Sequence, residues 1–179
     1  MREPEMLSSE EIYKGRIFAV RVDMVREGDR THAREVVHHP GSAAIVALFD
    51  DDTVALVRQY RHPAVKFMLE IPAGSRDEGE TPEACAAREL EEELGYVATQ
   101  MEKLAEFFVS PGFCTEKMWV YLATSLRETK QNPEEDEEFE IARVPLRRAL
   151  QMISTGEIED AKTIIGLLLT AARRGLSNF

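Results

Sequence analysis

One stretch, residues 70–97, constrains this chain more than any other: EIPAGSRDEGETPEACAARELEEELGYV. Its centre predicts a single helix with clear start and stop signals. Thr81 is a good N-cap, Pro82 suits the first helical position, and Gly95 suits the residue just past the C-terminus. The sequence therefore predicts a helix that starts near residue 82 and ends near residue 94.

This helix has an apolar stripe and a polar face that is crowded with carboxylates. At about 100° per residue, three apolar residues share one narrow stripe and three glutamates cluster almost opposite. The stripe is Ala87, Leu90 and Leu94, and the glutamates are Glu89, Glu92 and Glu93. If the stripe packs on a core, the three carboxylates point to one spot.

Like charges three and four residues apart repel each other, so a cation is expected at this spot. Carboxylates are hard oxygen donors, and a cluster of them without Cys or His suits Mg²⁺ or Mn²⁺ better than zinc. The alternative interpretation is an acidic helix face that is simply solvated.

The residues around the helix favour the metal. Gly74, Glu80 and the run RELEEELGY at 88–96 match the pattern G-x₅-E-x₇-R-E-U-x-E-E-x-G-U, in which U is a bulky apolar residue. This stretch resembles the complete Nudix box, and Tyr96 is its one departure, because an aliphatic residue is usual there. The resemblance implies a Nudix hydrolase, an enzyme that uses a divalent metal to cut a nucleoside diphosphate linked to another moiety.

The resemblance also implies roles for individual residues of the box. Glu89 and Glu93 match the principal metal ligands, and Glu92 matches a residue that assists them. A main-chain carbonyl near Ala73 commonly ligates metal in this family. Arg88 matches the arginine that orients the cluster by pairing with a carboxylate. The expected cofactor is Mg²⁺, with Mn²⁺ as a substitute.

The fold that the resemblance implies is of the α/β class, an α/β/α sandwich around a mixed β-sheet, preceded by an N-terminal β hairpin lobe. The expected domains are residues 1–40 for the lobe and 41–179 for the Nudix domain. Residues 1–10 are polar and expected to be loosely held, and residues 17–38 are expected to form the hairpin. The runs at 43–49 and 53–60 carry the strongest hairpin signal, and helices are expected at 146–154 and 160–174.

Composition limits the partners. The chain has 22 basic and 33 acidic residues and a net charge of −11, which is a poor match for nucleic acid or an anionic membrane. Two cysteines are too few for a disulfide framework, and no apolar run is long enough to span a bilayer. A cytoplasmic protein with a small-molecule substrate is expected.

A second resemblance narrows the substrate. Pro111 lies 16 residues beyond Gly95 and is followed by Glu116, which resembles the signature of the ADP-ribose pyrophosphatase branch. That branch implies hydrolysis of ADP-ribose to AMP and ribose 5-phosphate, and a homodimer with exchanged N-terminal lobes. The rivals are another nucleoside diphosphate sugar such as GDP-mannose, and a non-catalytic Nudix-fold nucleotide sensor. A Ca²⁺-binding module lacks the D-x-D-x-D-G spacing.

The branch also implies a set of substrate-binding residues. Arg61 matches an arginine that binds the diphosphate or the terminal ribose. The other members approach the adenine from the partner subunit or complete the site. The predicted set is Phe18, Arg34, Arg61, Glu70, Pro111 and Glu116. Phe18 also fits a core alternation, and each arginine also fits a surface strand.

The general base must be a carboxylate that is not used as a metal ligand. The acidic segment NPEEDEEFE at 132–140 supplies candidates, and its alternative interpretation is a disordered acidic loop. Strand alternation favours Glu138, because it shares a face with Glu140 if Phe139 and Ile141 turn toward the core. Glu137 is the second candidate, because loop length varies in the family.

Overall fold

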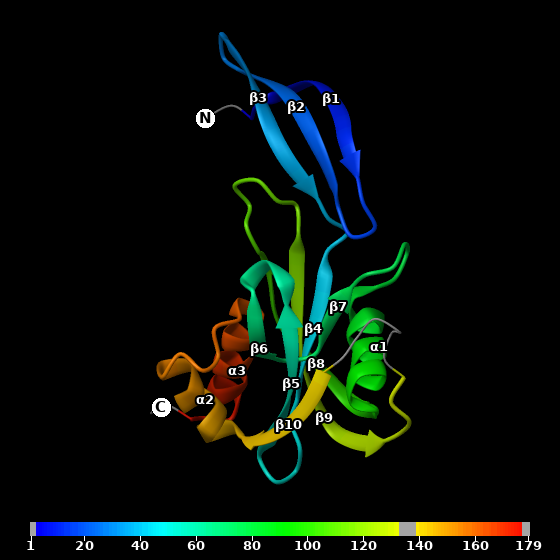
Figure 1. Cartoon of the computed structure of the whole chain (residues 1–179), viewed down its shortest axis with the longest axis vertical. Helices are drawn as coiled ribbons and strands as arrows, with labels where there is room; N and C mark the ends of the chain where they lie inside the picture. The colour runs from blue at the N-terminus through cyan, green and yellow to red at the C-terminus, as the bar shows by residue number, and fades with distance from the viewer. Residues whose placement is uncertain (1–2, 133–138, 177–179) are drawn as a thin grey trace. The chain divides into compact units, whose positions relative to one another are not determined.

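The computed structural model describes residues 3–132 and 139–176, and the chain forms two compact units. The smaller unit consists of Met1–Gly41 with Phe107–Met118, and the larger consists of Ser42–Glu106 with Trp119–Phe179. Figure 1 labels the elements of both units. No helix among the described residues is long and apolar enough to cross a membrane. The predicted domain boundaries stay a prediction.

The smaller unit contains a three-stranded antiparallel sheet. Its strands are β1 (Glu5–Lys14), β2 (Ala19–Glu27) and β3 (Arg30–His38), in the order β1-β2-β3. The expected hairpin is therefore confirmed as β2 and β3. Beside β3, Val37 donates its N–H to the carbonyl of Phe113 and accepts from the N–H of Thr115, at 2.8 and 2.9 Å. These bonds tie the loop around residue 113 to the sheet.

The expectation that residues 1–10 are loosely held is wrong for the part that forms β1. Every residue of β1 is exposed. Because the strand buries neither face, its sequence EMLSSEEIYK carries no apolar alternation that would predict a strand. It pairs with β2 along its length through the backbone, with register shifts between Met6 and Ser8 and between Glu11 and Tyr13. Backbone pairing at a sheet edge needs no buried side chains, and such irregularities are common there.

The larger unit is built on two sheets. The four-stranded sheet has the order β7-β4-β9-β8, and the three-stranded sheet has the order β10-β5-β6. The first comprises β4 (Ser42–Ala47), β7 (Ala73–Ser75), β8 (Tyr96–Phe108) and β9 (Lys117–Glu128). The second comprises β5 (Thr53–Arg61), β6 (Lys66–Glu70) and β10 (Phe139–Pro145), and a 3-10 turn at His62–Ala64 links β5 to β6.

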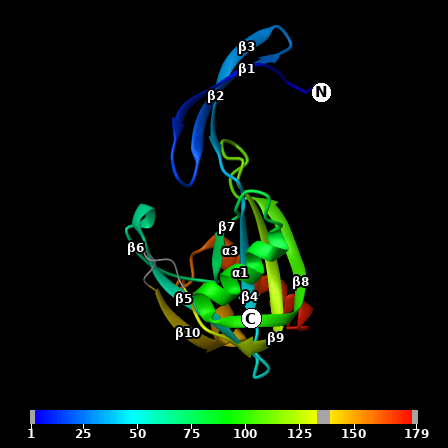
Figure 2. The same cartoon turned by 90° about the vertical axis from the view of Figure 1, so that its right-hand side faces the viewer.

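Among the described residues of this unit, three helices cover the sheets. They are α1 (Pro82–Leu94), α2 (Leu146–Ser154) and α3 (Ala161–Arg173), and the two C-terminal helices fall where the sequence predicts them. In the two views, α1 lies on one side of β4 and α3 on the other (Figures 1 and 2). This layering is the predicted α/β/α sandwich.

β4 is the centre of the core, and all six of its residues are buried. Ala43, Ile45 and Ala47 cluster with the apolar residues of α1. On the α3 side, a Cβ at Gly166 would come within 2.9 Å of Val46, so only glycine lets the helix lie this close to the sheet. A strand that is covered on both faces is apolar at every position, which explains the continuous run in the sequence.

The predicted hairpin of residues 43–49 and 53–60 is only partly correct. The turn is present, because Phe49 donates its N–H to the carbonyl of Thr53 at 2.9 Å. Beyond an isolated bridge between Leu48 and Val54, however, β4 and β5 belong to different sheets. The pattern correctly marks two apolar strands around a turn, but apolar patterning does not specify which neighbour each strand pairs with.

Candidate active site

The boundaries of α1 follow from local chemistry, as predicted. The hydroxyl of Thr81 accepts a hydrogen bond from the N–H of Ala84 at 3.2 Å, and Pro82 opens the helix. Gly95 closes it with a φ of 70°, in the left-handed region, and donates its N–H to the carbonyl of Glu91 at 2.9 Å. These caps hold the box glutamates on a helix with fixed ends.

The predicted orientation of α1 is wrong in one respect. Leu90 and Leu94 are buried, but Ala87 is exposed. Glu89 and Glu93 are 6% and 3% exposed and lie within the buried face instead of opposite it. The contact with β4 is thus centred on Leu90 and the neighbouring turns, so the helix is rotated toward its glutamates. Two carboxylates are therefore held inside the protein, which a merely solvated acidic face does not explain.

Arg88 links the carboxylates of the box. Its guanidinium donates to Glu89 Oε1 at 2.6 Å, to Glu92 Oε2 at 2.8 Å and to Glu80 Oε1 at 3.1 Å, and it also reaches the carbonyl of Ser75 at 3.1 Å. The hydrogen bond to Glu80 is the main cause that raises the pKa of Arg88, and the same bond lowers the pKa of Glu80. Arg88 therefore stays charged and fixes the directions of three glutamates.

Gly74 provides the space that Glu89 occupies. A Cβ at position 74 would lie 1.8 Å from Glu89 Oε1 and 2.2 Å from its Cδ. The preceding residue of this segment, Ala73, pairs with Ala44 at the start of β7. The Glu89 carboxylate therefore lies against the backbone that carries the Ala73 carbonyl.

Cys85 lies under the same loop but is not a nucleophile. Its Sγ atom is 3.6 Å from the carbonyl oxygen of Gly74 and 3.5 Å from Arg88 Nη2. Burial raises the pKa of its thiol to about 12, and the charges of Glu80 and Glu89 add to this effect. A thiol that stays protonated at neutral pH cannot supply the thiolate that covalent catalysis needs.

A divalent metal fits the donor set at this place. Glu89 and Glu93 offer two buried carboxylates, Glu92 offers a third that is partly exposed, and the backbone at Ala73 lies alongside. All are hard oxygen donors of the kind that Mg²⁺ and Mn²⁺ prefer. Within residues 3–132 and 139–176, no three His, Cys, Asp or Glu side chains already converge on one point. The ligand roles of these residues stay a prediction.

A second charged cluster in the larger unit involves two predicted substrate-binding residues. Arg61, the last residue of β5, donates from Nε and Nη2 to the two carboxylate oxygens of Glu70, at 2.8 and 2.7 Å. Lys162 also donates to Glu70 Oε2. Burial alone would raise the pKa of Glu70, but Arg61 and Lys162 together lower it to about 2. Glu70 is therefore ionised, and both of its oxygens are engaged by cations.

The other predicted substrate-binding residues lie in the smaller unit. Phe18 immediately precedes β2 and is partly exposed, with its ring 6.0 Å from that of Tyr13. Arg34 on β3 is exposed and pairs with Glu27 at 3.2 Å. Pro111 lies in a turn that Ser110 closes, and Glu116 accepts at its carbonyl from the N–H of Val109. Their roles stay a prediction.

The predicted bases, Glu137 and Glu138, lie outside the described residues. The predicted strand after them is confirmed as β10, which begins at Phe139 and pairs with β5. Ile141 is exposed instead of turned toward the core, so the strand alternation that favoured Glu138 is wrong. The second residue of β10, Glu140, is exposed and lies 3.5 Å from Arg58. On the other side of the undescribed segment, the N–H of Asn132 donates to the carbonyl of Glu92 at 3.1 Å. This bond connects Asn132 to the box helix.

Comparison with known proteins agrees with this geometry. The sequence model of the NUDIX domain matches residues 38–165. The chain belongs to the NUDIX family. The match covers the box, both sheets of the larger unit and the start of α3, which includes Lys162.

Two curated relatives are similar over nearly their whole length. "Methanol dehydrogenase activator" of Bacillus methanolicus is 40% identical over 92% of this chain and 91% of its own. "ADP-ribose pyrophosphatase" of Bacillus subtilis (strain 168) is 39% identical over 90% and 89%. A solved structure described as "Crystal structure of ADP compounds hydrolase" has a TM-score of 0.85 and 22% identity, and covers 99% of this chain and 98% of that one. The predicted family, branch resemblance and Nudix fold are confirmed.

The sequence did not reveal Lys162 or Asp160 as members of a charged cluster. Asp160 is readable as an N-cap, because it precedes the apolar pattern of α3, and its carboxylate does accept from the N–H of Thr163 at 2.9 Å. Lys162 gives no such signal, because a lysine in the first turn of an amphipathic helix is expected to be exposed. Its partner Glu70 is 92 residues away in the sequence.

Proposed function

We propose that the chain hydrolyses ADP-ribose to AMP and ribose 5-phosphate with Mg²⁺, for which Mn²⁺ can substitute. The observation that carries this proposal is the pair of buried carboxylates, Glu89 and Glu93, on a capped helix beneath Gly74, with Arg88 holding Glu89 in place. Membership of the family and the Bacillus subtilis relative support the choice of reaction and substrate.

In this reaction water attacks one phosphorus atom of the diphosphate, and the bond from that phosphorus to the bridging oxygen breaks. Each product then carries one phosphate. A divalent cation, when bound, offsets the charge of the diphosphate and makes water a better nucleophile. Glu89 and Glu93 would hold that cation, with Glu92 and the Ala73 carbonyl assisting. Arg88 holds the carboxylates of Glu80, Glu89 and Glu92 through hydrogen bonds.

Two further roles complete the proposal. Glu138 takes the proton of the attacking water, with Glu137 as the second candidate. Arg61 binds the diphosphate, because its guanidinium is held rigidly by Glu70 while its side chain remains 39% exposed. A fixed and partly exposed guanidinium is well suited to phosphate oxygens.

We also propose a homodimer in which Phe18, Arg34, Pro111 and Glu116 contribute to the partner's site. The smaller unit supports this, because large apolar side chains on β1 and on the connection from β1 to β2 remain exposed. They include Met6, Leu7, Ile12, Tyr13, Ile17 and Phe18. So small a sheet needs a packing partner. Light scattering that shows a fully active monomer at micromolar concentration would refute the dimer.

The substrate is tested by AMP and phosphate-ester release from a panel of nucleoside diphosphate derivatives, with Mg²⁺ and again with EDTA. ADP-ribose should give the highest kcat/KM, and EDTA should abolish turnover. A clear preference for GDP-mannose would show that the proposed substrate is wrong and that the proposed type of reaction is right. Binding of ADP-ribose without any turnover would favour a nucleotide sensor instead.

A further inference from the structure

The charged cluster around Glu70 joins three segments of the larger unit. Arg61 comes from the end of β5, Glu70 from the end of β6, and Lys162 from the first turn of α3. Glu70 is 2% exposed and the Lys162 side chain 10%, whereas that of Arg61 is 39% exposed. The buried part of the cluster therefore supports one partly exposed guanidinium.

Lys162 is anchored from two sides. Besides its hydrogen bond to Glu70, its Nζ atom lies 3.1 Å from Asp160 Oδ1. The other oxygen of Asp160 accepts from Thr163 at both its N–H and its hydroxyl, at 2.9 and 2.6 Å. The same hydroxyl accepts from the N–H of Ile71 at 2.9 Å. The start of α3 is thus connected to the strand end that leads into the Nudix box.

The position of Lys162 is not explained by helix stability. A cation in the first turn of a helix faces the positive end of the helix dipole, which disfavours it. Burying the stem of a lysine also costs rotamer entropy. Its partners offset these costs, but replacement of a buried ion pair by apolar residues is often neutral or stabilising. Helix stability alone therefore does not explain why a lysine occupies this position.

The charges of the cluster suggest a role for Lys162. Arg61 and Lys162 are positive, and Glu70 and Asp160 are negative. Without Lys162, two carboxylates would face one guanidinium, and the cluster would repel an anion. The pKa of Arg61 is raised mainly by its hydrogen bond to Glu70, against the effect of burial, and further by the charges of Glu93 and Asp160. Arg61 therefore already lies in the field of a box glutamate, and the cluster needs a second cation to attract a diphosphate.

We propose that Lys162 is a positioning residue for the substrate: it holds Glu70 Oε2 and balances the charge of the cluster so that Arg61 can bind the diphosphate. This inference rests on the proposed function, because it assumes that Arg61 contacts an anionic substrate. Lys162 itself is too deeply buried to do so. Its loss should therefore weaken substrate binding while the chemical step continues.

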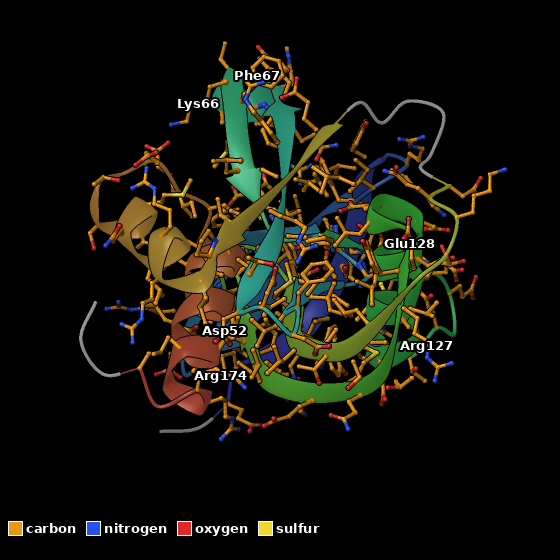
Figure 3. All side chains as sticks on the ribbon, turned by 90° about the horizontal axis from the view of Figure 1, so that it is seen from below. Asp52, Lys66, Phe67, Arg127, Glu128 and Arg174 are labelled. Carbon is orange, nitrogen blue, oxygen red and sulfur yellow. The ribbon has the colours of Figure 1, made fainter. Side chains whose placement is uncertain are left out.

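The chain offers a matched control. Lys66 also pairs with an acidic residue just before α3, Glu159, but both side chains are about half exposed. It lies opposite Arg61 in the β5–β6 register, at the exposed tip of this hairpin (Figure 3). Lys66→Met removes the same unit of charge near Arg61 without touching Glu70. The control therefore distinguishes the loss of the Lys162–Glu70 contact from the loss of one positive charge near Arg61.

The test compares wild type, Lys162→Met, Lys162→Arg and Lys66→Met for kcat and KM on ADP-ribose at saturating Mg²⁺, together with their thermal unfolding. Lys162→Met should raise KM about tenfold, the size of one lost charge-assisted interaction, while kcat stays within about twofold. Lys162→Arg should restore most of the affinity, and Lys66→Met should leave KM nearly unchanged. The affinities for ADP-ribose that calorimetry measures without metal should rank the four proteins in the same order as their KM values.

Three results would overturn the inference: an unchanged KM in Lys162→Met, an equal rise in Lys66→Met, or a fall in kcat alone. If Lys162→Met does not fold, Lys162→Gln removes the same positive charge but keeps an amide N–H that can donate to Glu70. It should fold and still show the raised KM, and a wild-type KM would refute the role. If wild type hydrolyses no panel substrate, the proposed function itself fails. If wild type hydrolyses ADP-ribose and Lys162→Met has the same KM, only the positioning role of Lys162 is refuted.

Discussion

Replacing Gly74 by alanine should disable the site with little damage to the fold. The new Cβ would lie 1.8 Å from Glu89 Oε1, 2.2 Å from Cδ and 2.7 Å from Oε2, whereas ordinary contacts begin at 3.4 Å. The carboxylate must therefore move by roughly 1.5 Å, which also breaks its 2.6 Å hydrogen bond with Arg88. Misplacement of a catalytic group by about 1 Å costs roughly 100-fold in rate. Gly74→Ala should thus lose at least about 100-fold in kcat/KM and bind Mg²⁺ more weakly.

The assay is AMP release from ADP-ribose over a range of Mg²⁺ concentrations, with thermal unfolding measured in parallel. Overpacking of this kind costs about 1–3 kcal/mol, so Gly74→Ala should remain folded at 25 °C. Gly112→Ala is the matched control, because a Cβ there meets no atom within 4 Å. It should be indistinguishable from wild type. Near-wild-type activity and Mg²⁺ dependence in Gly74→Ala would show that the position of Glu89 does not matter, and would refute the reasoning.

Three other predictions concern the proposed base, Arg61 and Glu70. Glu138→Gln should lose most of kcat with little change in KM. If Glu138→Gln keeps the wild-type rate while Glu137→Gln is inactive, the base is Glu137. Arg61→Ala should weaken ADP-ribose binding far more than Mg²⁺ binding in calorimetry, and equal losses would count against its role. The pKa of Glu70 is lowered from 4.5 to about 2, so its ion pairs should stabilise the fold by about 3 kcal/mol above pH 4.5 and lose this contribution as the pH falls toward 2. Urea titrations of wild type and Glu70→Gln should therefore converge at low pH, and a constant difference would exclude this linkage.

The parts of the fold that local chemistry encodes were predictable from the sequence. The cap at Thr81 and the left-handed turn at Gly95 each depend on residues within a turn or so of the helix end, so the bounds of α1 could be predicted. The order of charges in the box likewise identified the cluster around Arg88. For the same reason, α2 and α3 were visible as amphipathic segments.

The parts that depend on distant partners were not predictable. β1 is exposed along its whole length and is held by pairing with β2, so its side chains carry no pattern. The rotation of α1 that buries Glu89 and Glu93 depends on how β4 and β7 pack beneath it. Lys162 meets Glu70 across 92 residues, and only the fold brings them together. The sequence thus identified the chemistry of the box, but not the buried cation that supports Arg61.

The most direct test of the account is the rate of AMP release from ADP-ribose as a function of Mg²⁺ concentration in wild type, Glu93→Gln and Glu91→Gln. Glu93 is buried, whereas Glu91 is exposed on the same helix, where its carboxylate accepts from the hydroxyl of Thr129 at 3.2 Å. Wild type and Glu91→Gln should release AMP only when Mg²⁺ is present, and Glu93→Gln should be slower by orders of magnitude at every concentration. Turnover by wild type without a divalent metal, or near-wild-type turnover by Glu93→Gln, would contradict the central claim.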